Sequence, residues 1–158
     1  MSQETDLKQA QNVYKALCEM LDEREWHYEK FDEDLTVKCG VQGDDLPMEM
    51  LIEVDKTRQL VTLLSFMPFA IPENRRTALA VAVAQANNGM VDGSFDFDYA
   101  RGKIIFRMTT SYRASLIGKE LFAYMLACAG YTIDEYNDKF LTVAKNEMSI
   151  DEILEYIK

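Results

Sequence analysis

Residues 60–73 read LVTLLSFMPFAIPE, and this stretch decides the fold. Its first half, Leu60 to Phe66, is almost continuously apolar, which is typical of a strand that is covered on both faces. The covering layer can be helices of the same chain or another subunit. Pro68 and Pro72 end the strand, and Pro72 also suits the first turn of a helix, because its missing N–H has no partner to lose there.

Alternating apolar and polar residues on both sides of this segment predict further strands. They cover Trp26–Tyr28, Leu35–Val41, Met48–Val54, Phe95–Tyr99 and Ile104–Met108. Polar turns separate these segments, and Gly102 supplies the positive φ that the last hairpin requires. The pattern therefore predicts a mostly antiparallel sheet.

Apolar residues at three- and four-residue steps predict the helices. These are expected from the N-cap Asp6, with Gln9 as its reciprocal partner, to about 22–25, over 72–88, from Ser115 to about 126, over 134–144, and after Ser149. Gly89 is expected to cap the Ala-rich second helix in the left-handed conformation, and Gly130 to break or end the third. Ser149 and Glu152 form a capping box.

The predicted element order is α-β-β-β-β-α-β-β-α-α. This order indicates the α+β fold class, with a small antiparallel sheet and helices packed on it. The sequence contains no linker, repeat or low-complexity segment. Residues 1–158 are therefore expected to form a single domain.

The charge balance limits the partners. The 158 residues carry 17 Lys and Arg against 27 Asp and Glu, a net charge of −10, and the excess lies in 1–34 and 131–158. Such a surface repels phosphate backbones and anionic lipids, so neither nucleic acid nor membrane is expected as a partner. The acidic ends are expected to be solvated helices, with an acidic face for a basic partner as the alternative.

Cysteine usage and the N-terminus favour a cytoplasmic location. Cys18, Cys39 and Cys128 lack CxxC spacing and lie in apolar patterns, as buried thiols of a reducing compartment do. Residues 1–6 have neither a basic leader nor an apolar core, and no apolar run approaches the ~20 residues of a membrane-spanning helix.

No sequence motif points to catalysis. Asp92, Asp96 and Asp98 could coordinate a hard cation, but acidic residues that alternate along a solvent face account for them better. Clustered His and Cys ligands, a P-loop and a GxGxxG motif are all missing from the sequence. We therefore expect no enzyme, no cofactor and no metal.

From residue 13 to residue 157 the chain resembles the YbjN-like family of bacterial proteins, which are described as sensory transduction regulators. The matching features are the 60–73 segment, the Ala-rich helix that ends in Asn87-Asn88-Gly89, the hairpin over 95–108 and the closing segment 149–153. Members look like type III secretion chaperones in fold and are usually dimeric. The resemblance implies protein binding, and it brings no catalytic residue.

These observations give one leading hypothesis, a non-enzymatic, cytoplasmic, protein-binding regulator or chaperone-like adaptor that forms a homodimer. The candidate dimer interface comprises Leu60, Leu64, Phe66, Leu79, Ala82 and Val83. The candidate partner groove comprises Trp26, Tyr28 and Val37, next to the first helix. The alternative is a small-molecule or anion sensor that uses Arg75, Arg76 or a pocket of the sheet.

Overall fold

The computed structural model describes residues 3–158, so the expectation about a leader at residues 1 and 2 lies outside it. The helices are α1 (Gln3–Glu23), α2 (Arg76–Asn87), α3 (Lys119–Lys145) and α4 (Ile150–Ile157). The strands are β1 (Tyr28–Phe31), β2 (Thr36–Val41), β3 (Met48–Asp55), β4 (Leu60–Phe66), β5 (Ser94–Asp98) and β6 (Lys103–Ser111). Short 3-10 helices, η1 (Asp32–Asp34) and η2 (Glu73–Arg75), follow β1 and precede α2.

The strands form one sheet in the order β1-β2-β3-β4-β6-β5, and each neighbouring pair is antiparallel. The α+β class and the order of elements are thus confirmed. Helix α2 lies between β4 and β5 in the sequence, and β4 pairs with β6. Within residues 3–158, no helix combines the length and the apolar composition that a membrane span requires.

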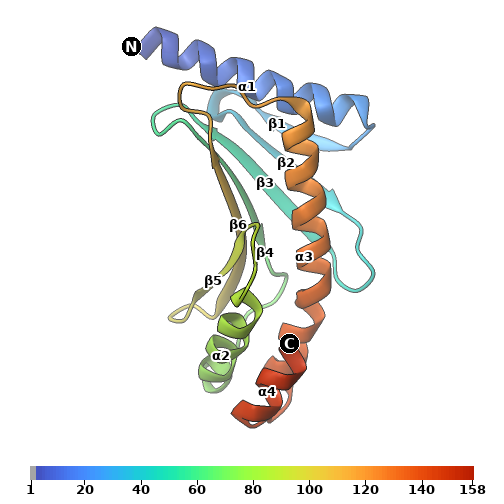
Figure 1. Ribbon diagram of the computed structural model, residues 1–158. Helices are drawn as coiled ribbons and strands as arrows, with labels where there is room; N and C mark the ends of the chain where they lie inside the picture. Colours follow the sequence, from blue (N-terminus) through green and yellow to red (C-terminus); the bar gives the residue numbers. More distant parts are fainter. Residues whose placement is uncertain (1–2) are drawn as a thin grey trace.

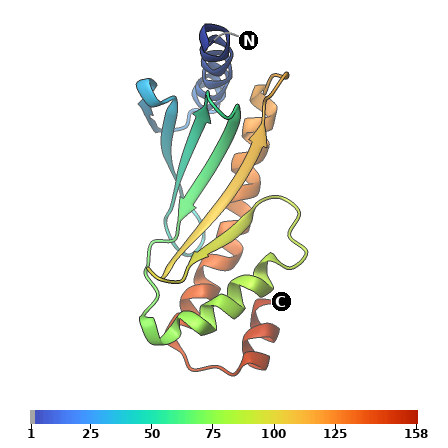
Figure 2. The same cartoon turned by 90° about the vertical axis from the view of Figure 1, so that its left-hand side faces the viewer.

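The sheet is covered by helices on one face only. Helix α3 runs along this inner face and α1 lies across its end (Figure 1), whereas the view from the other side shows the strands in front of α3 (Figure 2). On β4, Val61 and Leu63 are buried, while Leu64 is half-buried and Phe66 is 53% exposed. The predicted second cover of β4 therefore does not come from the described helices, because α1 and α3 lie on the same side.

Helix α3 is one continuous helix of 27 residues, so the predicted break at Gly130 is wrong. A glycine inside a helix costs only about 1 kcal/mol relative to alanine, and burial of the flanking Ala129 and Ile133 outweighs this cost. The helix also begins at Lys119, after the N-cap Gly118, and not at Ser115.

The start of α1 also differs from the prediction. Asp6 lies inside α1, which already begins at Gln3, so Asp6 is not its N-cap. The Gln9 side chain donates to the carbonyl of Ser115, 2.9 Å away, and so ties α1 to the loop before α3. Asp6 and Gln9 have the three-residue spacing of a capping box, but the Gln9 side chain binds Ser115, which is distant in the sequence.

Two of the predicted helix ends are confirmed. Ser149 and Glu152 form the reciprocal capping box at the start of α4. Gly89 follows α2 with φ +82°, the left-handed conformation that glycine adopts without strain.

The buried side of α2 corrects part of the predicted dimer interface. Leu79, Ala82 and Val83 are buried within the chain, where α2 packs against α3, α4 and β5. The side chain of Asn87 adds two hydrogen bonds of 2.8 Å, to the backbone N–H and C=O of Phe95. The small residues of α2 therefore serve close packing with helices of the same chain, and these three side chains offer no surface to a second copy.

We predict a large and a small loss of stability for two substitutions on opposite sides of α2. Ala82→Glu places an unpaired charge in the core and is expected to lower the free energy of unfolding by about 3–5 kcal/mol. Ala84 is exposed, so Ala84→Glu should change the free energy of unfolding by less than about 0.5 kcal/mol. Urea denaturation followed by circular dichroism measures both values, and equal effects would contradict the observed orientation of α2.

Candidate binding groove and exposed sheet face

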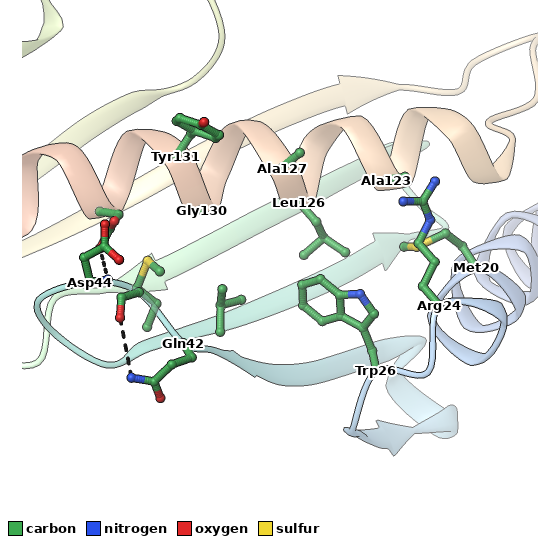
Figure 3. Close-up of a pocket in the computed structure, with 14 residues that line it drawn as sticks. Met20, Arg24, Trp26, Gln42, Asp44, Ala123, Leu126, Ala127, Gly130 and Tyr131 are labelled. Carbon is green, nitrogen blue, oxygen red and sulfur yellow. Dashed lines mark hydrogen bonds between the residues drawn. The ribbon is translucent and has the colours of Figure 1, made fainter.

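A groove of about 480 Å³ lies between α3 and the β2 side of the sheet. The end of α1 contributes Met20 and Arg24, and the next segment contributes Trp26. Helix α3 forms the opposite wall, and the loop after β2 closes one end, as Figure 3 shows. The volume lies within the range of known ligand sites.

The geometry at the end of α1 places Trp26. Glu25 has φ +59°, its N–H donates to Asp22, and the N–H of Trp26 donates to Leu21 over 2.9 Å. This pair of bonds is a Schellman motif, which reverses the chain and favours an apolar contact by the residue that follows it. Trp26 is consequently half-buried, with its ring facing Leu126 of α3 (Figure 3).

The wall that α3 contributes is made of small residues. Ala123, Ala127 and Gly130 line the groove at steps of four and three residues, on one side of the helix. Because they carry one methyl group or none, the space beside α3 stays open. Tyr131 lines the same groove and is 85% exposed.

The loop between β2 and β3 is tied to α3. The Oδ1 atom of Asp134 accepts a 2.9 Å hydrogen bond from the backbone N–H of Asp44. A Cβ atom on Gly43 would collide with the same carboxylate and with the terminal methyl group of Met48, so a larger residue would displace these two side-chain ends. This contact fixes the closed end of the groove.

The two ends of the groove carry opposite charge. At the α1 end, no carboxylate among residues 3–158 forms an ion pair with Arg24. At the loop end, loss of hydration and the neighbouring carboxylates of Asp138, Asp134 and Asp44 raise the pKa of Asp45. The groove therefore has a cationic end, an apolar middle and an anionic end.

The structure brings together only part of the predicted partner groove. Trp26 lines the groove, but the side chain of Val37 on β2 is fully buried in the core. The Tyr28 hydroxyl donates to Asp22 over 2.7 Å, and burial followed by this hydrogen bond raises the pKa of Tyr28. Both side chains face the core because they occupy inward positions of paired strands, Tyr28 opposite Cys39 and Val37 opposite Ile52.

Arg75 and Arg76, the predicted anion ligands, hold the backbone. Arg75 donates to the carbonyls of Val143, over 2.7 Å, and of Asn146, at the end of α3. Arg76 donates over 3.1 Å to Ile71 and over 2.7 Å to the carbonyl of residue 100. A cation at a helix C-terminus is favourable, so Arg75 stabilises the fold and does not form an open anion site.

The acidic residues of the second hairpin also have partners. Asp96 forms a 2.8 Å ion pair with Arg107, Asp98 forms one of 3.3 Å with the neighbouring arginine at 101, and Asp92 accepts a hydrogen bond from Tyr124. Among residues 3–158, no group of three or more His, Cys, Asp or Glu side chains is arranged to hold a metal ion.

A second surface is the outer face of the sheet. Leu60, Leu64 and Phe66 lie there on β4, in the same orientation. Register places Leu51 of β3 opposite Leu64, and Ile105 of β6 opposite Phe66. Leu51, Leu64, Phe66 and Ile105 form a short apolar strip across three central strands, whereas Thr62 separates Leu60 from it, so two of the six residues of the predicted dimer interface lie on the strip.

The comparisons with known proteins agree with this fold. The sequence profile of the YbjN family, described as "putative bacterial sensory transduction regulator", matches residues 14–142. The chain belongs to the YbjN family. This confirms the resemblance found in the sequence. A search of curated proteins found no match.

Solved structures similar to this YbjN-family chain include a family member and two protein complexes. The crystal structure of YbjN from E. coli aligns with a TM-score of 0.57 and 14% identity, covering 80% of this chain and 92% of that chain. The ExsC–ExsE complex aligns with a TM-score of 0.55 and 15% identity, and the alignment covers 85% of this chain and 95% of that chain. The HopA1–SchA chaperone–effector complex aligns with a TM-score of 0.51 and 12% identity, and the alignment covers 82% of this chain and 94% of that chain. At these identities the likeness shows the fold, and the predicted type III secretion chaperone-like architecture is confirmed.

We predict that the Asp134 carboxylate restrains the loop that closes the groove. In Asp134→Ala, the amide of Asp44 loses its acceptor, and its hydrogen exchange should accelerate about threefold to tenfold, which corresponds to one hydrogen bond. NMR or mass spectrometry measures the rate. Asp138→Ala removes a nearby carboxylate that does not accept this bond, so it should leave the rate unchanged, and equal acceleration in both variants would contradict the assignment.

Proposed function

We propose that this YbjN-family chain is a non-enzymatic regulator or chaperone-like adaptor that binds a segment of another polypeptide in the groove. The observation that carries the proposal is the half-buried Trp26, which faces Leu126 in an open apolar cavity. Aromatic anchors in apolar pockets supply most of the binding free energy at protein interfaces.

The comparisons support this proposal at the level of the fold. Two of the similar structures are a chaperone–effector complex and the ExsC–ExsE complex, so the same architecture accompanies polypeptide binding in other proteins. Cys18, Cys39 and Cys128 are unpaired, which supports a reducing compartment and therefore our proposal of a cytoplasmic location. We also propose that residues 1–158 act as a single domain.

We further propose that the chain forms a homodimer through the outer face of its sheet. Leu64 and Phe66 of the predicted interface form a strip with Leu51 and Ile105, and Leu60 lies on the same face beyond Thr62. A connected apolar strip on a sheet face that no helix of the chain covers favours association in water. Leu79, Ala82 and Val83 are excluded from this interface because they are buried in the core.

The alternative function is that of a small-molecule sensor. The cavity volume of about 480 Å³ would hold a small amphiphilic ligand as well as a peptide. The anion-binding version loses its support, because Arg75 and Arg76 donate to backbone carbonyls. A thermal-shift screen of metabolites, run beside the selection of peptides from a random library, separates the two functions: a metabolite that stabilises the chain, with no peptide that binds the groove, would contradict the adaptor.

We predict that Trp26 reports and anchors peptide binding. Peptides selected from a random library on the purified chain should protect the single tryptophan from acrylamide quenching. Trp26→Ala should weaken these peptides by about tenfold or more, as expected for an aromatic anchor. Tyr156→Ala, which removes an exposed aromatic side chain on α4, should leave affinity unchanged. Selected peptides that bind equally well to the wild type, Trp26→Ala and Tyr156→Ala would contradict peptide binding in the groove.

We predict that Leu64→Glu separates the dimer. Multi-angle light scattering at micromolar concentration should report about twice the chain mass of 18.2 kDa for the wild type. In the variant, the charge at the centre of the apolar strip would have to be desolvated in the dimer, so the monomer mass is expected. Ala84→Glu adds the same charge on α2, away from the strip, and should remain dimeric. A monomeric wild type would rule out the interface.

A further inference from the structure

The charges along the groove indicate which kind of polypeptide segment it binds. This inference rests on the proposed function, because it takes polypeptide binding as given and assigns the chemistry of the bound segment. Arg24 stands at one end, Trp26 and Leu126 lie in the middle, and Asp44 stands at the other end (Figure 3). Asp134 lies at the same end and accepts a hydrogen bond from the backbone N–H of Asp44.

The length of the groove follows from α3. Lining residues on this helix run from Ala123 to Asp134, eleven steps along the helix. At a rise of about 1.5 Å per residue this is about 16 Å, which corresponds to about five residues of extended chain at ~3.3 Å each. The small side of α3 at Ala127 and Gly130 leaves room for the backbone of such a segment.

We propose that the groove binds an extended segment of about five residues in one charge order: an acidic side chain at Arg24, apolar side chains over Trp26 and Leu126, and Lys or Arg at the aspartates of the loop end. A wholly apolar segment leaves both charged ends without partners. A segment of the opposite order places like charges together, which costs affinity and disfavours that register.

The anionic end contributes more to this selection than the cationic end. Asp44 and Asp134 line the groove there, and loss of hydration together with the carboxylates of Asp138, Asp134 and Asp44 raises the pKa of Asp45 beside them. No Lys or Arg of residues 3–158 forms an ion pair with these four carboxylates. A basic side chain of the partner relieves their mutual repulsion, and the overall charge of −10 attracts basic segments to the surface.

The test exchanges the two ends of the groove. A random heptapeptide library is selected on the purified wild-type chain and on the double variant Arg24→Glu with Asp44→Lys. Both side chains are exposed, and the backbone N–H of Asp44 keeps its bond to Asp134 in the variant. Wild-type selection should enrich one order of acidic, apolar and basic residues along the peptide, and the double variant should lose this order, because its α1 end becomes acidic while Asp45, Asp134 and Asp138 stay at the loop end.

Synthetic peptides then measure the size of the effect. The best wild-type peptide and its charge-reversed counterpart should differ in Kd by about tenfold or more on the wild-type chain, as expected for two exposed ion pairs exchanged for two repulsions, and this difference should disappear on the double variant. The neutral variants Arg24→Gln and Asp44→Asn should each lose selectivity at one end only.

A matched control carries the same charge changes elsewhere. Arg113→Glu with Glu147→Lys alters two exposed residues outside the groove and should keep the wild-type preference. Selected peptides that depend on Trp26 but show no charge order, or an order that persists in the double variant, would overturn this inference and leave the proposed function intact. Selected peptides that are all indifferent to Trp26→Ala would overturn both.

Discussion

The packing of α3 against the inner face of the sheet is the contact on which the rest of the structure depends. The helix buries Phe122, Met125 and Leu126 near its start, and Phe140 near its end. Phe140 meets Phe95 of β5 edge to face, with ring centroids 5.0 Å apart, and such aromatic pairs add stability beyond the area that they bury. Helix α1 packs on the first part of α3, and α2 and α4 pack on the last part.

The sequence predicts the strands well because their information is local. On β3 and β4, inward and outward residues alternate, and the predicted bounds of β4 agree with the structure. Gly130 was misleading because tertiary burial outweighs its weak helix propensity. For Leu79, Ala82 and Val83, the pattern correctly indicated a contact face, but a sequence does not say whether the contacting helix belongs to the same chain.

The groove was harder to predict because its parts lie far apart in the sequence. Trp26 is placed by a turn with Glu25 in the left-handed conformation, where glycine would have been the recognisable signal. The small residues at 123, 127 and 130 were visible, but their spacing equally suits close helix packing. Only the pairing of Asp44 with Asp134, ninety residues apart, shows where the groove ends.

The groove and the apolar strip lie on opposite faces of the sheet, since Met48 lines the groove from an inward position of β3 and Leu64 faces outward on β4. In the proposed dimer, the two sheets would meet through their outer faces and both grooves would stay open. Such a dimer would present two binding sites to one partner, and two weak contacts held at a fixed separation bind more tightly than either contact alone. A groove of about 480 Å³ that contacts only a few side chains would therefore suit an adaptor, because the proposed dimer would supply the affinity that one short segment lacks.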